Sequence, residues 1–145
     1  MILAILTYLI PAAIVPIQVG FVASLATKLS DTFGSEVGKA YGKTTYLVTT
    51  LKPVPRGTEG AVSLEGTVAG IVGSILIVML GIFTNLITGW KASNAIIVSA
   101  FIANFVESYI GATYQDKVKW LSNELVNFIN TTIGAILAII LFSIF

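Results

Sequence analysis

The sequence predicts an all-α fold, a polytopic transmembrane helical bundle of about four spans, with a polar cytosolic or stromal loop that forms the site. The chain has 145 residues, of which 56% are hydrophobic and only 10% are charged. A soluble domain carries roughly a quarter charged residues. After residue 66, three apolar stretches are each long enough to cross the hydrocarbon, which takes about twenty residues. Residues 1–145 are therefore predicted to be a single membrane domain.

The composition restricts the chemistry that a site could use. The chain contains no cysteine and no histidine, and its net charge is +1. Disulfides, thiolate nucleophiles, structural zinc and histidine acid–base catalysis are therefore excluded. The small net charge gives no reason to expect a nucleic acid as partner. Catalysis would rely on carboxylates, lysine or arginine, hydroxyl groups, backbone N–H groups and a hard cation such as Mg²⁺.

The first apolar stretch, residues 1–27, is predicted to be a kinked span that is retained, because it lacks the basic start of a secretory signal. Pro11 and Pro16 will kink or interrupt it. It is either one kinked span, or the end of one span followed by a second helix that Pro16 opens and that runs towards Gly38. In the second case, one helix face carries Ser24, Lys28, Asp31, Ser35 and Gly38, with Glu36 and Lys39 to one side. The spacing fits both a site-forming face and a solvated helix with intrahelical ion pairs.

Residues 28–66 form a polar segment that holds most of the charged residues of the chain. In a membrane protein such a segment is a functional site by default. Lys52 and Arg56 bracket a turn in which two prolines stiffen the approach and two glycines allow positive φ. Successive N–H groups in such a turn can form an anion-binding nest, although an ordinary tight loop has the same composition. The predicted phosphate-binding residues are Lys52, Arg56, Gly57, Thr58, Glu59, Gly60, Ser63 and Glu65.

Residues 67–89, 93–114 and 121–145 are the other predicted spans. The first of them has a face of small residues suited to close helix packing, made of Gly66, Gly70, Ser74 and Gly81 with Gly73 beside them. The second contains Glu107, and a carboxylate inside a membrane helix is costly unless it is paired, hydrated or bound to a metal. A glutamate reaching out from a helix end is the weaker reading, because Glu107 lies about two turns from the next charge, Asp116. Polar stripes in these spans and on the first helix give the supporting residues Ser35, Asn104, Ser108, Gln115, Asn123, Glu124 and Asn127.

The basic residues predict the topology. The segment 28–66 has five Lys/Arg, the loop 89–94 has one, and the loop 115–122 has two. By the positive-inside rule, the first and last of these lie on the cytosolic or stromal side. The polar ends of the spans face the same side, so we expect the polar features to converge on one site at the inner membrane boundary.

Four motifs, DTFGSEVGKAYGKTTYLVTT, KPVPRGTEGAVSLEGTVAG, NFVESYIGATYQDK and KWLSNELVNFIN, together resemble the phytyl-phosphate kinase branch of an integral-membrane family of plants and cyanobacteria. The resemblance runs from about Phe21 to the C-terminus. It implies conversion of phytyl phosphate to phytyl diphosphate with a nucleoside triphosphate, for tocopherol and phylloquinone synthesis, in a cyanobacterial or plastid membrane. A looser similarity to phytol and dolichol kinases implies CTP as donor. Family members carry further spans before the first motif, so the resemblance also implies missing N-terminal spans or a partner that supplies them.

The function expected is thus a membrane-embedded prenyl-phosphate kinase. Asp31, Glu36, Lys39 and Glu107 are its predicted catalytic residues, and Asp31 and Glu107 are expected to share Mg²⁺, with Asn104 or Asn123 as neutral ligands. The expected partners are membrane lipid, the prenyl phosphate, the nucleoside triphosphate and a second copy of the chain or the missing spans, with no nucleic acid. Two alternatives use similar residues: a lipid-phosphate cytidylyltransferase and a small transporter subunit.

The topology makes a prediction of its own. Cysteines introduced at Thr58 and at Ser93 should react with a membrane-impermeant thiol reagent from opposite sides of sealed vesicles, because the predicted loops alternate across the membrane. The cysteine-free chain provides the background. Labelling of both positions from one side would contradict the predicted topology.

Overall fold

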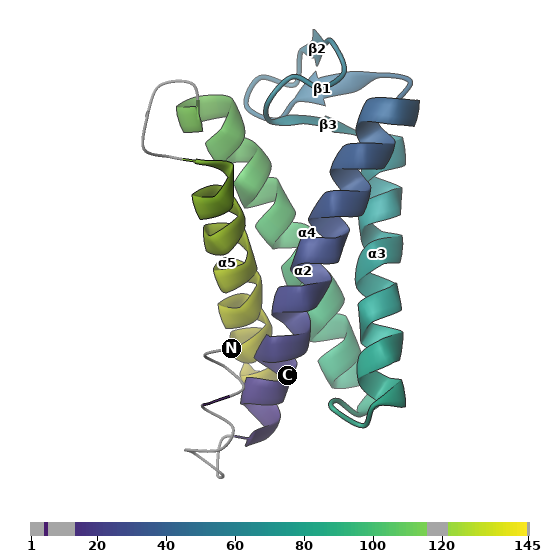
Figure 1. The fold of residues 1–145 in the computed structure, drawn as a ribbon, viewed down its shortest axis with the longest axis vertical. Helices are drawn as coiled ribbons and strands as arrows, with labels where there is room; N and C mark the ends of the chain where they lie inside the picture. The colour runs from purple at the N-terminus through teal and green to yellow at the C-terminus, as the bar shows by residue number, and fades with distance from the viewer. Residues whose placement is uncertain (1–4, 6–13, 116–121, 145) are drawn as a thin grey trace.

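The helices of the computed structural model run alternately up and down in a bundle that carries a small β-sheet at one end (Figure 1). The structure describes Ile5, residues 14–115 and residues 122–144. Helix α2 spans Ile14–Tyr41, α3 Leu64–Phe83, α4 Gly89–Ile110 and α5 Asn123–Ile144, and the π-helical segment η2 at Gly111–Gln115 continues α4. Three stretches are long and apolar enough to cross a membrane, Leu64–Phe83, Gly89–Tyr114 and Asn123–Ile144. The predicted all-α polytopic bundle is confirmed.

The first predicted span, 1–27, falls partly outside the described residues. From Ile14 onwards the chain agrees with the second alternative in having a helix that continues past Gly38, but α2 spans Ile14–Tyr41 and so includes two residues before Pro16. Pro16 lies in the first turn, where its missing N–H removes no intrahelical hydrogen bond. Residues 28–41 of the predicted polar segment 28–66 are therefore helical, residues 64–66 belong to α3, and only residues 42–63 connect α2 to α3.

The observed bounds of the other three spans differ from the predicted bounds by a few residues. Helix α3 begins at Leu64, three residues before the predicted start, because Ser63 caps it: the Ser63 hydroxyl accepts a hydrogen bond from the N–H of Gly66 at 3.1 Å. It ends at Phe83, where Asn85 adopts a φ of 57° and turns the chain towards α4. Helix α4 accordingly starts at Gly89 rather than at residue 93.

A three-stranded antiparallel sheet, which the sequence analysis did not predict, connects α2 to α3. Its strands are β1 (Thr45–Leu47), β2 (Pro53–Val54) and β3 (Ala61–Ser63), in the order β2-β1-β3. Pro53 lies in an edge strand, where a residue without an N–H is tolerated. Because β3 leads directly into α3, the sheet is held over the end of the bundle (Figure 1).

Close contact between α2 and α3 confirms the predicted small-residue face. Gly66, Gly70 and Gly73 are buried against the backbone of α2. A Cβ atom at Gly70 would lie 3.0 Å from the carbonyl oxygen of Ser30, and one at Gly73 would lie 3.0 Å from that of Leu29. The apolar core lies nearer the other end of the bundle, around Val19, Val22, Ala26, Val78 and Ile96. The end next to the sheet is left to polar residues.

This contact predicts a stability difference between two substitutions on α3. Gly70→Leu should lower the apparent midpoint of thermal unfolding in detergent, because overpacking costs about 1–3 kcal/mol. Val72→Leu is the matched control, since Val72 is exposed on the same helix. Circular dichroism of both variants checks the expectation, and equal midpoints would contradict the tight α2–α3 contact.

Candidate functional site

A polar cavity of about 370 Å³ opens at the sheet end of the bundle. Its walls come from α2, α4 and α5, and from the turn that precedes β3. The cavity brings together most of the sequence-predicted residues: Asp31, Ser35, Glu36, Lys39, Gly57, Thr58, Glu59, Ser63, Glu107, Ser108, Asn123 and Asn127. The expected convergence of polar features from separate segments is thus found in the tertiary structure.

The cavity face of α2 carries the charged residues that the helical spacing placed there. The Lys28 Nζ lies 3.0 Å from Asp31 Oδ2, and it also donates a hydrogen bond of 2.6 Å to Asn127 Oδ1 on α5. Lys39 and Glu36 form a second ion pair, at 3.6 Å, with both side chains largely exposed. Both interpretations of the helical spacing therefore apply: α2 contains intrahelical ion pairs, and the same face of the helix lines the cavity.

Glu107 brings a second carboxyl group to Asp31. It extends from α4 into the same cavity that Asp31 lines, and the two carboxyl groups interact electrostatically. Two carboxylates this close repel each other unless a proton or a cation lies between them. The structure therefore agrees with the predicted proximity of Asp31 and Glu107.

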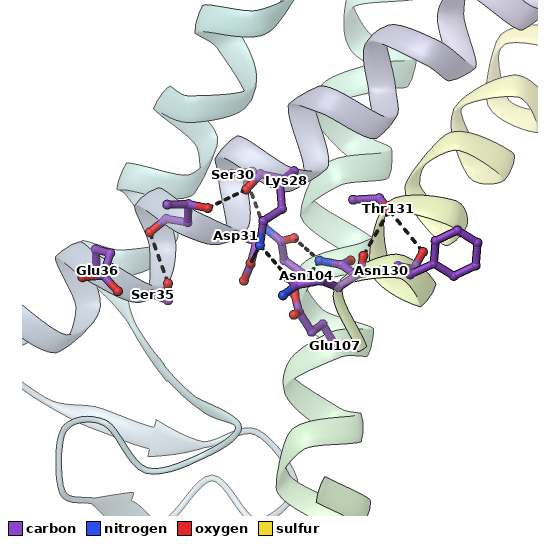
Figure 2. A network of polar contacts seen from close by, with 12 residues as sticks. Lys28, Ser30, Asp31, Ser35, Glu36, Asn104, Glu107, Asn130 and Thr131 are labelled. Atoms are coloured by element: carbon purple, nitrogen blue, oxygen red, sulfur yellow. Dashed lines mark hydrogen bonds and ion pairs between the residues drawn. The ribbon is translucent and has the colours of Figure 1, made fainter. Parts of the chain in front are cut away.

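Behind the cavity, a chain of hydrogen bonds links three helices (Figure 2). Asn104 on α4 donates to Ser30 Oγ on α2 at 2.8 Å. Asn130 on α5 donates to Asn104 Oδ1 at 3.2 Å and also to a carboxylate oxygen of Glu107. Asn130 is almost fully buried, so its amide holds Glu107 in place from inside the bundle. The sequence analysis omitted Asn130 from the site, although its spacing of three residues from Asn127 was an available signal.

The turn before β3 lies over the cavity. Gly57 and Gly60 have φ values of 80° and 73°, which glycine adopts readily. Gly60 packs directly against the backbone of Ser108 and Ala112, so a side chain at this position would push the turn away from α4. The N–H of Thr58 donates to the carbonyl of Pro55 at 3.3 Å and is engaged within the turn itself. Gly57, Thr58 and Glu59 are the residues of the turn that line the cavity.

Several predicted residues lie elsewhere. Lys52 and Arg56 do not line the cavity, and Arg56 instead donates a hydrogen bond of 3.3 Å to the carbonyl of Ala40. Glu65 lies in the first turn of α3, Glu124 is exposed on α5, and the side chain of Gln115 lies outside the described residues. Gly60 and Asn104 lie next to the cavity but not in its lining.

The lysines that do line the cavity are Lys28 and Lys39. Lys28 was noted on the polar face of the helix but omitted from the predicted site, and Thr32 and Thr45 were missed entirely. Thr45 could not be found from helical spacing, because it belongs to an unpredicted strand.

The donor set fits one kind of metal site. Among the described residues, no group of three acidic side chains surrounds a common point. A cation held by protein groups alone is therefore not supported by this part of the chain. Mg²⁺, however, is commonly bound by one or two carboxylates together with substrate phosphate oxygens and water, and the Asp31–Glu107 pair offers that arrangement.

The hydrogen-bonded chain predicts that Asn130 stabilises the bundle. Asn130→Ala should lower the unfolding midpoint, because leaving buried polar groups of Asn104 and Glu107 without a partner costs about 1–3 kcal/mol. Thr132→Ala is the control, since Thr132 is exposed and bonds only to its own helix, at Phe128 O. A variant as stable as Thr132→Ala would show that the buried amide bonds add nothing to stability.

Known proteins resemble this chain along most of its length. It is 55% identical over 126 residues to Protein VTE6, chloroplastic, of Arabidopsis thaliana, a match covering 86% of this chain and 38% of that protein. It is 57% identical over 126 residues to an uncharacterized membrane protein of Synechocystis, covering 85% of this chain and 47% of the relative. An uncharacterized membrane protein of Methanocaldococcus jannaschii is 35% identical over 125 residues, covering 86% and 51%. The chain thus spans about half the length of these relatives, or less.

No solved structure matches the chain. A family model described as integral membrane protein DUF92 matches residues 1–135. Together with the apolar helices and the chloroplast and cyanobacterial relatives, this match identifies a multi-pass membrane protein of plastid or cyanobacterial type. The chain belongs to the DUF92 family of integral membrane proteins.

Proposed function

We propose that this protein phosphorylates a prenyl phosphate, with phytyl phosphate as the expected acceptor, to the diphosphate at the expense of a nucleoside triphosphate. The observation that carries the proposal is the pair of facing carboxyl groups, Asp31 and Glu107, beside Lys28 in a polar cavity of a membrane bundle. Phosphoryl transfer depends on positioning, a divalent cation and positive charge around the phosphates, and it needs little covalent chemistry from the protein.

The cavity residues have distinct roles in this proposal. Asp31 and Glu107 would hold Mg²⁺ together with phosphate oxygens, and the ion when bound supplies charge neutralisation. Lys28 and Lys39 add positive charge at the cavity wall. Asn130 and Asn127 keep Glu107 and Lys28 aimed into the cavity through their hydrogen bonds. The turn at Gly57–Glu59 closes the cavity from the sheet side.

The reaction needs no histidine. The acceptor phosphate already carries a nucleophilic oxygen, which forms a bond to the γ-phosphorus while the bond from that phosphorus to the departing nucleoside diphosphate breaks. The products are the prenyl diphosphate and the nucleoside diphosphate. A chain with no histidine and no cysteine can therefore support this chemistry with the residues that it has.

Two further points support the proposal. The 55% identity to chloroplast VTE6 extends over 126 residues, and that relative's name agrees with a role in vitamin E synthesis. A lipid-soluble acceptor also explains why a phosphate-binding cavity lies at the end of membrane helices. CTP remains the expected donor, through the looser similarity to phytol and dolichol kinases.

Glu107→Gln tests the proposal directly. The protein in lipid nanodiscs is incubated with phytyl phosphate, Mg²⁺ and each nucleoside triphosphate in turn, and lipid products are separated by mass spectrometry. We expect phytyl diphosphate from the unmodified chain and a loss of roughly a hundredfold or more in Glu107→Gln, because a charge that acts in the transition state is removed. The substitution keeps the size of the side chain.

Ser99→Ala is the matched control. Ser99 is buried on the same helix, but its hydroxyl bonds only to Ile96 O in its own helix, and it does not line the cavity. It should retain full activity. A CDP-linked lipid as product would instead favour a cytidylyltransferase, and full activity of Glu107→Gln would remove the carboxyl pair from the mechanism.

A further inference from the structure

Two further hollows lie along α4 below the sheet. The smaller, about 60 Å³, lies between α2, α3, α4 and β3, and its lining includes Gly70, Ile71, Phe101, Asn104, Phe105 and Ser108. The larger, about 380 Å³, is formed entirely by apolar and aromatic residues: Val48, Phe101, Ile102, Phe105, Val106 and Tyr109. Both are lined by residues of α4, the helix that diverges from α3 on its way to the sheet (Figure 1).

The hollows and the polar cavity share lining residues. Ser108 borders both the cavity and the smaller hollow, while Phe101 and Phe105 border both hollows. Strand β3 separates the first two spaces: Ala61 and Ser63 line the cavity, and Val62 between them lines the hollow, as the alternation of side chains along a strand requires. The cavity and the smaller hollow therefore lie on opposite faces of β3 and adjoin along α4 at Ser108, the residue that borders both.

The other helix boundaries next to the cavity are closed. Between α2 and α3, Gly66 and Gly70 bring the two backbones into contact at Gly34 and Ser30. Between α2 and α5, Lys28 bonds to Asn127, and Thr27 packs onto Gly134.

Between α4 and α5, the boundary is bridged by Asn130 and Glu107. Within the residues that the structure describes, the α3–α4 boundary is thus the side on which a chain could leave the cavity towards the hydrocarbon.

We propose that the isoprenoid tail of the acceptor leaves the cavity past Ser108, crosses the smaller hollow beside Ile71 and lies in the apolar groove formed by Phe101, Ile102, Phe105, Val106 and Tyr109. This inference rests on the proposed function, because it assigns the tail of the same acceptor whose phosphate occupies the cavity. The segment from Ser108 to Phe101 covers about 10 Å of helix, so several isoprene carbons lie against aromatic side chains. Phe101 and Phe105 pack with their ring centroids 5.0 Å apart and form the floor of the groove.

The binding experiment uses a phytyl phosphate analogue that carries a diazirine on its tail. The protein in nanodiscs is irradiated with this probe, with and without excess phytyl phosphate, and the labelled residues are located by mass spectrometry. We expect labelling at Phe101–Tyr109 and around Ile71 that phytyl phosphate suppresses. A phosphatidylcholine with a diazirine in its acyl chain serves as the probe for bulk lipid.

Matched substitutions on α3 provide a second measurement. Ile71→Trp fills the smaller hollow, whereas Val72→Trp places the same side chain on the exposed face one residue away. Ile71→Trp should weaken binding of phytyl phosphate, measured by competition against the probe, roughly tenfold, as expected when about two buried methylenes lose their site. Ile71→Trp should not change binding of the nucleotide or of isopentenyl phosphate, whose tail is too short to enter the groove. Val72→Trp should behave like the unmodified chain.

Each result decides the proposal. The tail site would be overturned if phytyl phosphate suppressed labelling at α2 or α5 instead of the groove, or if it suppressed no labelling at all. Labelling of the groove by the bulk lipid probe alone would also overturn it. So would equal binding of phytyl phosphate by Ile71→Trp and Val72→Trp. Because the label reports binding without turnover, suppressible labelling of the groove with no diphosphate from any nucleotide would keep the tail site and reject the kinase.

Discussion

The charged face of α2 can lie within a bundle of apolar helices because α4 and α5 supply polar partners for it. Lys28 is paired with Asp31 one turn away and with Asn127 on α5, and Asp31 in turn meets Glu107 on α4. Each of these charges alone would be costly among membrane helices. Together they form a polar cluster whose members are held by three helices, and the position of the cavity follows from that cluster.

The buried amides extend this arrangement into the bundle. Asn104 and Asn130 connect α2, α4 and α5 below the cavity, so that Glu107 is held from the side away from the cavity. Glycines allow α3 to approach α2 closely on the remaining side. Polar contacts thus join α2, α4 and α5, and close backbone contact joins α3 to α2. Among the described helices, the boundary between α3 and α4 is therefore the most open one at the sheet end.

The sheet and the turn before it complete the cavity, and their placement depends on contacts distant in sequence. Gly60 lies against the end of α4, and Ser63 both ends β3 and caps α3. These contacts fix the chain that follows the turn at Gly57–Glu59, and the residues of the turn line the cavity. This combination is compatible with the proposed phosphate site beneath a backbone turn.

The sequence by itself determined the class of the protein, because hydrophobic runs of about twenty residues and a very low charge content have few other solutions. Helical spacing also placed Asp31, Ser35 and Gly38 on one face, since that face depends only on the local periodicity of 3.6 residues. Tertiary structure decided the role of Lys28, the burial of Asn130 and the absence of Lys52 and Arg56 from the cavity lining. Which side chains meet across helices depends on crossing angles and on the short strands between residues 45 and 63, and neither is encoded in the periodicity of any single segment.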